Sequence, residues 1–297
     1  MNRSRRLHSR QGRAFAPASR ERLRLDGRRG SPYTGFVNFI ATLGHRTIDR
    51  FRTFGYALGF LGRVLSETLL FFRRRQVAYK VLVMQILFTG VEALGIATIL
   101  AVGIGAIINI VGMSLLPQFG QGQLMYTILI AIITRELGPL LTAFIITARS
   151  GTAIATELGG MVVSHEIEAY VSIGIDPISY LVVPRFLGVT ISCFLLNIYF
   201  NFFGLLASYG VLILIKPLPY AEYYQGIIGA LKGADLATGL VKSVVFGALI
   251  SIVSTYQGFS VARASTEIPQ AGIRAVGQAF TSLVIADGVI TAVSYLA

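Results

Sequence analysis

The chain has 297 residues, of which 54% are hydrophobic and only 13% are charged, and its formal net charge is +12. Soluble domains of this length carry about 25% charged residues, so the composition excludes an ordinary soluble enzyme or binding domain. Several apolar runs reach the roughly 20 residues that a helix needs to cross a bilayer. We therefore expect one large all-α membrane domain.

The N-terminal region is strongly basic, because residues 1–30 hold ten arginines against Glu21 and Asp26. Positive charge before a first span favours a cytoplasmic N-terminus, and five spans then place the C-terminus on the periplasmic side. We expect residues 1–35 to form a basic, disordered cytoplasmic tail in front of a membrane domain over 36–297. An organelle transit peptide is the alternative, since the segment is rich in arginine and poor in acids.

The first predicted element is a helix over about 45–75, within the stretch "IDRFRTFGYALGFLGRVLSETLLFFRRR". Its apolar residues recur at spacings of three and four, and its charged residues lie largely off that stripe. This pattern is typical of a helix that lies in the membrane interface. A tilted first span is the alternative.

Five longer apolar runs follow, and each predicts a transmembrane helix. The expected spans cover about 81–111, 123–148, 186–215, 237–258 and 277–296. A polar loop joins the third and fourth spans. The connections over 150–185 and 259–275 carry arginines, which favours the cytoplasmic side for both.

Charged residues stand inside these spans, where each central one costs about 2.5–3.5 kcal/mol on insertion scales. They are Glu92, Arg135, Glu136, Lys242 and Asp287. Arg135 and Glu136 are sequence neighbours that project about 100° apart on a helix, so each needs a partner elsewhere. We expect Lys242 to pair with Glu136, and Asp287 or Glu92 to pair with Arg135.

Gly138 and Pro139 follow this charged pair almost directly. Pro139 cannot donate a hydrogen bond to the carbonyl of Arg135, so we expect a kink and a free backbone acceptor beside the charges. Two interpretations of the charges are open: an ion network that locks helices together, or a polar patch beside a substrate path. The second is favoured, because charged groups in spans usually face cavities.

Small residues recur every four positions in the fourth predicted span: Gly239, Ser243, Gly247 and Ser251. Such a face lets helix backbones approach closely, either within one chain or between subunits. Cys193 is the only cysteine, so no intrachain disulfide is possible.

The segment between the second and third predicted spans contains an amphipathic helix over about 157–173. Val163, Ile167, Tyr170 and Val171 share one face, and "GIDP" ends the helix. The segment is acidic, so we expect it to bind a groove on a protein partner rather than anionic lipid. No metal site is expected, since "HEIEA" lacks the second histidine of a zinc-protease motif.

Several separated motifs follow one another along the chain in an order that matches a family signature. The motif "RELGPLLTAFIITARSGTAIATELGGM" is followed by "EIEAYVSIGIDPISYLVVPR", "VKSVVFGALIS", "AGIRAVGQAF" and "IADGVITAV". Together they resemble the signature of the MlaE/YrbE permeases, the membrane subunits of MCE-associated lipid ABC transporters. The resemblance covers roughly 80–297. It departs at "VSHEIEAY", where the family commonly reads "VTEQIDAL", so that His165 replaces an acid and Tyr170 replaces a leucine.

This resemblance implies a homodimer with an interfacial helix and five spans, in a bacterial inner membrane or, alternatively, a plastid inner envelope. It implies four further partners: a cytoplasmic ABC ATPase dimer, an MCE-domain protein on the outer side, a small cytoplasmic STAS-type accessory protein, and phospholipid in a cavity between the two permeases. The in-membrane charges of the family map onto Arg135, Glu136 and Lys242. The residues assigned to ATPase coupling are Glu157, Met161, His165, Glu166, Ile167, Glu168, Tyr170, Asp176 and Pro177.

The expected function is that of a permease subunit that moves phospholipid or a related lipid, driven by a separate ATPase. No GxxxxGK[ST] occurs in the chain, so ATP-Mg is expected on the partner and no cofactor on this chain. Neither nucleic-acid binding nor a catalytic role is expected, and the spans lack paired aspartates or a His-rich site. An ion-coupled secondary transporter that uses the buried carboxylates is the alternative.

Overall fold

The computed structural model describes residues 59, 62–64, 66–68, 78–115, 124–215, 219–262 and 264–296. The predicted tail over 1–35 and most of the predicted interfacial helix over 45–75 lie outside these described residues. The chain divides into two compact units, Met1–Phe60 and Leu61–Ala297, and the fold given below is that of the second unit. Every regular element among its described residues is a helix.

Five helical stretches are long and apolar enough to cross a membrane, which confirms the all-α membrane fold predicted from composition. They cover Lys80–Gly112, Leu124–Val163, Ile178–Gly210, Gly233–Phe259 and Ser265–Leu296. Their α-helical segments are α3 (Ala78–Gly90) and α4 (Leu94–Leu115), then α5 (Leu124–Ile130), α6 (Gly138–Ile146) and α7 (Thr152–Val163), then α9 (Val183–Ile215), α11 (Gly233–Phe259) and α12 (Ile268–Leu296). Two shorter helices are α8 (Glu166–Ser172) and α10 (Tyr220–Ala230).

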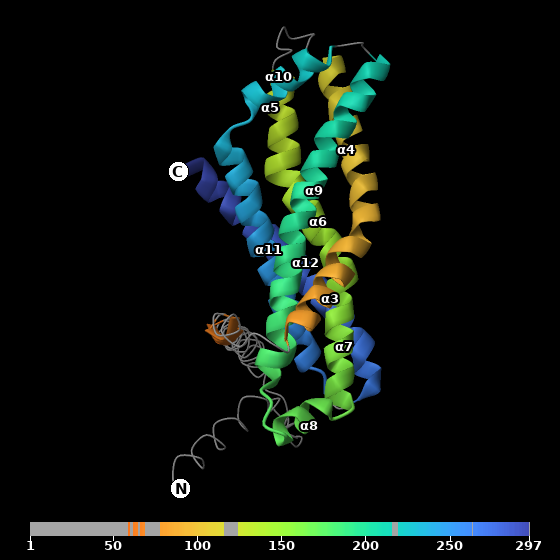
Figure 1. Cartoon of the computed structure of the whole chain (residues 1–297), viewed down its shortest axis with the longest axis vertical. Coiled ribbons are helices and arrows are strands. Elements are labelled where there is room, and N and C mark those ends of the chain that lie inside the picture. The colour runs from red at the N-terminus through yellow and green to blue at the C-terminus, as the bar shows by residue number, and fades with distance from the viewer. Residues whose placement is uncertain are drawn as a thin grey trace, which may run out of the picture. The chain divides into compact units, whose positions relative to one another are not determined.

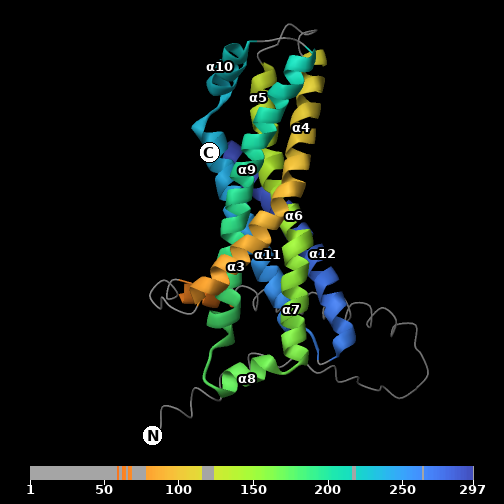
Figure 2. The same ribbon diagram turned by 45° about the vertical axis from the view of Figure 1, so that its right-hand side comes forward.

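Helix α9 lies at the centre of this bundle, and α3, α4 and α11 pack along it (Figure 1). Helix α8 lies at one end of the bundle and α10 at the other, and a second view agrees on this arrangement (Figure 2). Helices α7 and α12 pack against each other towards the α8 end. Within this chain α9 is the most buried span and α12 the least, so much of α12 is available to lipid or to another protein.

Three spans extend further towards the α8 end than the sequence predicts. The second continues to Val163 instead of about 148, the third begins at Ile178 instead of about 186, and the fifth begins at Ser265 instead of about 277. These extensions contain small and polar residues, which end an apolar run without ending a helix. The small residues also pack: a Cβ at Gly272 would lie 3.0 Å from Cγ2 of Thr152 on α7.

The predicted polar loop before the fourth span contains a helix, α10, that the hydropathy pattern does not indicate. Tyr223 of α10 is buried, and its hydroxyl is hydrogen-bonded to the hydroxyl of Ser208 on α9. Its ring lies 5.1 Å from the ring of Tyr209, centroid to centroid. Burial raises the pKa of Tyr223 to about 12, so the hydroxyl stays neutral. Tyr223, together with the buried Ile227, thus attaches α10 to the bundle.

At Gly138 and Pro139, where the sequence predicts a kink, a π-helical stretch, Ala131–Leu137, ends immediately before these two residues. The N–H of Gly138 donates to the carbonyl oxygen of Ile133, five residues back instead of four. A Cβ at position 138 would lie 2.5 Å from that same oxygen, so glycine is required here. A second π-helical stretch, Thr147–Gly151, follows in the same span. Both stretches carry charged side chains, and short π-helical insertions occur frequently at functional sites.

The small-residue face of α11 packs within the same chain, an alternative that the sequence leaves open. A Cβ at Gly247 would lie 2.6 Å from the Cα of Thr190 on α9, and one at Gly239 would overlap the carbonyl oxygen of Thr134. The other members of this face are buried as well: Ser243 and Ser251. Helix α11 therefore lies against both α9 and the second span.

The helix predicted over 157–173 is wrong as a single element, because the chain breaks it at His165. This residue has a φ of 60°, in the left-handed region that His adopts more readily than most residues. Residues 157–163 therefore end α7, whereas Glu166–Ser172 form α8. The predicted end at "GIDP" is confirmed, since Gly174 has a φ of 81° just beyond α8.

Candidate functional site

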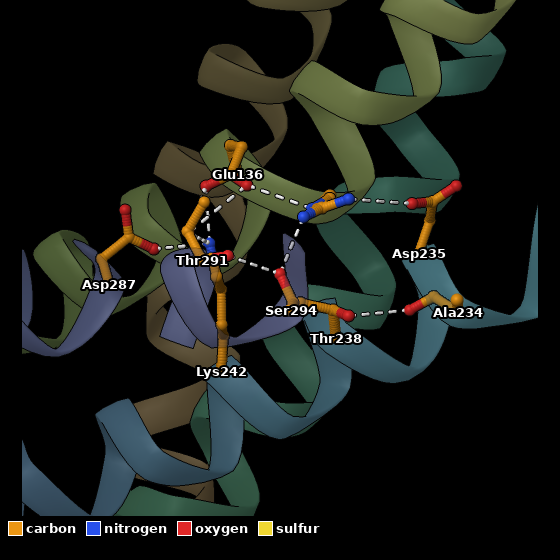
Figure 3. A network of polar contacts seen from close by, with 9 residues as sticks. Glu136, Ala234, Asp235, Thr238, Lys242, Asp287, Thr291 and Ser294 are labelled. Atoms are coloured by element: carbon orange, nitrogen blue, oxygen red, sulfur yellow. Dashed lines mark hydrogen bonds and ion pairs between the residues drawn. The ribbon is translucent and has the colours of Figure 1, made fainter. Parts of the chain in front are cut away.

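Lys242 of α11 is the centre of an ion-pair network that joins three spans (Figure 3). Its ammonium nitrogen lies 2.5 Å from Oε2 of Glu136. The same nitrogen lies 2.8 Å from Oδ1 of Asp287 and 2.7 Å from Oγ1 of Thr291. Three oxygens thus face the three N–H donors of the ammonium group. Glu136 stands in the first π-helical stretch and the other two residues on α12, so Lys242 connects the second, fourth and fifth spans.

Arg135 extends this network on one side of Glu136. Its Nη2 donates to Oγ of Ser294 at 2.7 Å, and its Nη1 lies 3.6 Å from Oδ1 of Asp235. Its Nε lies 3.4 Å from Oε1 of Glu136. The guanidinium carbon lies 4.0 Å from the ring centroid of Tyr295, within cation–π distance. Arg135 is therefore held by side chains from α11, from α12 and from its own turn.

The predicted pairing of Lys242 with Glu136 is confirmed. The predicted partners of Arg135 are wrong, because Asp287 pairs with Lys242 and Glu92 lies outside the network. The expectation that Arg135 and Glu136 find only separate partners is wrong as well, since the two side chains approach each other. A hydropathy pattern does not tell which helices are neighbours, so it leaves the partners of a buried charge undetermined.

Sequence reasoning misses four residues of the network: Asp235, Thr291, Ser294 and Tyr295. Asp235 is missed because α11 begins at Gly233, before the predicted start at about 237. The other three carry no formal charge, so a search for charges does not find them. Helical spacing does provide a signal, since Asp287, Thr291 and Ser294 are four and three residues apart and share one face of α12.

The network holds two cations and three carboxylates, so its formal charge is minus one. The exposed fraction of the side chain is 0% for Lys242, 13% for Arg135 and 33% for Glu136. The two cations are therefore enclosed by their partners, while Glu136 presents a carboxylate at the surface of the chain. No group of three or more metal-ligating side chains that could hold a metal ion occurs among the described residues.

The network lies well inside the length of the second span. Arg135 is eleven residues from Leu124, or about 17 Å along a helix. Asp235 stands in the first turn of α11, and Ser294 stands in the last turn of α12. The network therefore occupies the α10-side portions of the fourth and fifth spans, where Lys242 and Asp287 each lie nine residues inside their helix, while the second span continues past it.

A second ion pair lies further along the second span. Arg149, in the π-helical stretch Thr147–Gly151, donates from Nη1 to the carbonyl oxygen of Glu92 and from Nη2 to its carboxylate. Glu92 stands in a 3-10 turn, Val91–Ala93, between α3 and α4. This contact ties the first span to the second. Glu92, one of the predicted in-membrane charges, thus belongs to a separate pair.

Glu157 forms an ion pair with its own chain. Its Oε1 lies 2.7 Å from Nη2 of Arg185, whose side chain is almost fully buried between α7 and α9. Nη1 of Arg185 also donates to the carbonyl oxygen of Leu181 at 2.9 Å. Glu157 therefore holds together the two helices that flank α8.

Helix α8 presents a mixed surface. Its exposed side chains include two acidic residues, Glu166 and Glu168, and Val171, and the apolar Ile173 directly after the helix is exposed too. Tyr170 is half-buried, and its ring lies 5.4 Å from that of Tyr180 near the start of α9. Ile167 packs against the bundle as well. Of the predicted apolar face, Ile167 and Tyr170 thus pack inward while Val171 is exposed, and the exposed surface combines acidic and apolar side chains.

The connection between α8 and α9 contacts the stretch before the first span. Pro177 is buried, and Asp176 accepts a hydrogen bond from the N–H of Ser179. Oγ of Ser179 lies 2.7 Å from Oε2 of Glu67. Glu67 belongs to the few described residues of the predicted interfacial helix, and it contacts the connection that follows α8.

Comparison with known proteins shows which sequence family the chain resembles. A family model described as Permease MlaE matches residues 82–293. The chain is 27% identical over 260 residues to the intermembrane phospholipid transport system permease protein MlaE of Haemophilus influenzae, which covers 87% of this chain and 98% of that protein. It is 27% identical over 258 residues to a probable ABC transporter permease protein of Rickettsia felis, and this alignment covers 87% of this chain and 95% of that protein. It is 28% identical over 210 residues to the chloroplastic protein TRIGALACTOSYLDIACYLGLYCEROL 1 of Arabidopsis thaliana, and this alignment covers 68% of this chain and 58% of that protein.

Proposed function

This chain belongs to the MlaE permease family of ABC transporters, and we propose that it moves phospholipid or a related lipid between the membrane and an MCE-domain protein. ATP hydrolysis on a separate subunit drives the movement. The relative from Haemophilus influenzae is named for intermembrane phospholipid transport, which supports this class of substrate.

The observation that carries this proposal is the charged network within the predominantly apolar spans. A phospholipid has a charged head and apolar tails, so its binding site needs apolar surface beside a few fixed polar groups. Charged residues within spans are costly, and they commonly mark substrate pathways. Glu136 is 33% exposed next to the apolar surface of the second span, which matches this requirement.

The proposed assembly contains two copies of this chain in the bacterial inner membrane, with lipid between them. The N-terminus and α8 face the cytoplasm, and α10 and the C-terminus face the MCE-domain protein. The arginines near the α8 end support this orientation by the positive-inside rule. An ABC ATPase dimer and a small STAS-type accessory protein complete the assembly on the cytoplasmic side.

Replacing Arg135 with Ala tests the lipid site. We expect the chain to fold, because Lys242 still bridges three spans, but we expect retained phospholipid to fall about tenfold. The reason is electrostatic: the network changes from a formal charge of minus one to minus two and repels the lipid phosphate. Mass spectrometry of lipids in the purified complex measures the loss. The exposed Arg274, substituted in the same way, is the control, and simple loss of expression of Arg135→Ala would instead support a purely structural network.

Reversing the charge of Glu166 and Glu168 together tests the ATPase contact. We expect the ATPase subunit to be lost on co-purification, because both carboxylates are exposed on α8 and a partner groove must meet them with positive charge. Tyr170 is left unchanged, since it anchors α8 to the bundle. Glu222→Lys on α10, at the opposite end of the bundle, is the matched control. Undiminished co-purification of the double variant would contradict the assignment.

The ion-coupled alternative makes a different prediction for the chain without its partners. Buried carboxylates in such a transporter exchange protons with the medium during each cycle. Uptake of lipid by the reconstituted chain alone, driven by a proton gradient, would favour that alternative over the ABC transporter.

A further inference from the structure

The ion pair of Arg149 and Glu92 has no role in the function proposed above. Arg149 lies 14 residues beyond Arg135 on the same continuous span, or about 21 Å along a helix. That separation is about two thirds of the thickness of a bilayer's hydrocarbon core. The two charged groups therefore lie at different membrane depths.

Both members of this pair are open at the surface of the chain. The exposed fraction of the side chain is 35% for Arg149 and 45% for Glu92. Charged side chains within spans face the interior of a bundle or a water-filled cavity, because hydrocarbon solvates them poorly. The exposed side of this pair therefore faces polar groups or water instead of lipid tails.

One partly exposed stripe of the second span runs from the network to the neighbourhood of this pair. Residues at intervals of four along this stripe are all incompletely buried: Glu136, Leu140, Phe144, Ala148 and Thr152. Residues on the opposite side of the same helix are buried in the bundle: Gly138, Thr142, Ile146, Ser150 and Ile154. The stripe begins at the network and reaches Ala148, which is adjacent to Arg149. It is apolar between its charged ends.

The guanidinium of Arg149 keeps donors for a ligand. Two of its five N–H groups donate to Glu92, and the described residues offer no acceptor to the other three. A guanidinium matches the geometry of a phosphate with paired hydrogen bonds, better than any other side chain. Glu92 occupies part of this fork and acts as an internal competitor for an incoming anion.

We propose that Arg149 is a second headgroup site on the lipid path, which binds the phosphate of a phospholipid while the apolar stripe contacts its tails. This inference rests on the proposed function, because it assigns a further site on the same path. Arg149 stands in a π-helical stretch, as Arg135 and Glu136 do, and such stretches are frequent at functional sites. Lipid thus passes between two charged sites on one helix.

Opposite substitutions of the two partners test this proposal. The probe is a diacyl phosphatidylethanolamine with a diazirine on the acyl carbon nearest the glycerol, added to the delipidated full-length chain. After photolysis, mass spectrometry locates the labelled residues. In the wild type we expect label near the network, over 132–140, and near the pair, over 144–152. Arg149→Gln should reduce label over 144–152 about tenfold and leave label over 132–140 unchanged.

Glu92→Gln gives the decisive contrast. It frees the guanidinium from its competing carboxylate, so label over 144–152 should rise about threefold to tenfold. If the pair only connects two helices, both substitutions should lower the label, and the proposal is overturned. Arg274→Gln is the matched control and should change neither region.

Further results distinguish a failure of the second headgroup site from a failure of the proposed lipid-transport function. Label over 132–140 without label over 144–152 in the wild type overturns the second site and leaves the lipid-transport function intact. Absence of label from both regions overturns both. A diacylglycerol probe should not label 144–152, since it lacks the phosphate. Displacement of the lipid probe by millimolar inorganic phosphate would identify a site for free phosphate and overturn the lipid assignment.

Discussion

Replacing Lys242 with Met should lower the free energy of unfolding by about 3 kcal/mol, because it leaves the partly buried carboxylate of Asp287 without a cation and Glu136 with Arg135 alone. Lys242 has no exposed side-chain surface, and its ammonium group lies within 2.8 Å of Glu136 and Asp287. Met replaces the unbranched aliphatic stem of the side chain, one atom shorter, but supplies neither charge nor donors. Unfolding of the detergent-purified chain by sodium dodecyl sulfate, followed by circular dichroism, measures the change.

The double variant Lys242→Met, Asp287→Leu is the control for this prediction. It removes a carboxylate together with its cation, and well-packed apolar replacement of a buried ion pair is often close to neutral. We expect it to recover at least half of the lost stability. A single variant as stable as the wild type would show that the network does not hold the three spans together.

Replacing Gly247 with Val should lower the free energy of unfolding by about 3 kcal/mol, because α9 leaves no room for a side chain there. A Cβ at this position would lie 2.6 Å from the Cα of Thr190 and 3.1 Å from Cβ of Cys193. The first of these atoms is backbone, so relief requires the two helices to separate. Unfolding in sodium dodecyl sulfate measures this loss too.

Gly103→Val is the matched substitution for Gly247→Val. Gly103 also lies within a span, but a Cβ there would have no atom within 4 Å among its described surroundings. We expect its stability to stay within about 0.5 kcal/mol of the wild type. Equal losses from both variants would show that the close approach of α9 and α11 is not the cause.

The number and order of the spans could be predicted from the sequence because both depend on apolar length. A helix crosses a bilayer when about 20 consecutive residues are apolar, and that count needs no knowledge of neighbours. The ends of the helices could not be predicted as well from the sequence. The second span runs to Val163 because its polar-looking extension packs against α11 and α12, and hydropathy does not report such packing.

The candidate site was partly predictable for a related reason. Charged residues in apolar runs stand out, so Arg135, Glu136, Lys242 and Asp287 could be named directly. Asp235 could not, because its place inside the bundle depends on where α11 begins. The break at His165 also escaped prediction, since a single residue in the left-handed region leaves no periodic signal.

The sequence by itself determined the class of protein, its five spans, its buried charges and the family to which it belongs. These properties follow from composition, from the length of apolar runs and from the order of motifs along the chain. Only the tertiary structure decided which charges meet, which face of α8 is exposed, and that α11 packs on its own chain. Those outcomes depend on contacts between segments far apart in sequence, and a one-dimensional pattern carries no distances between helices.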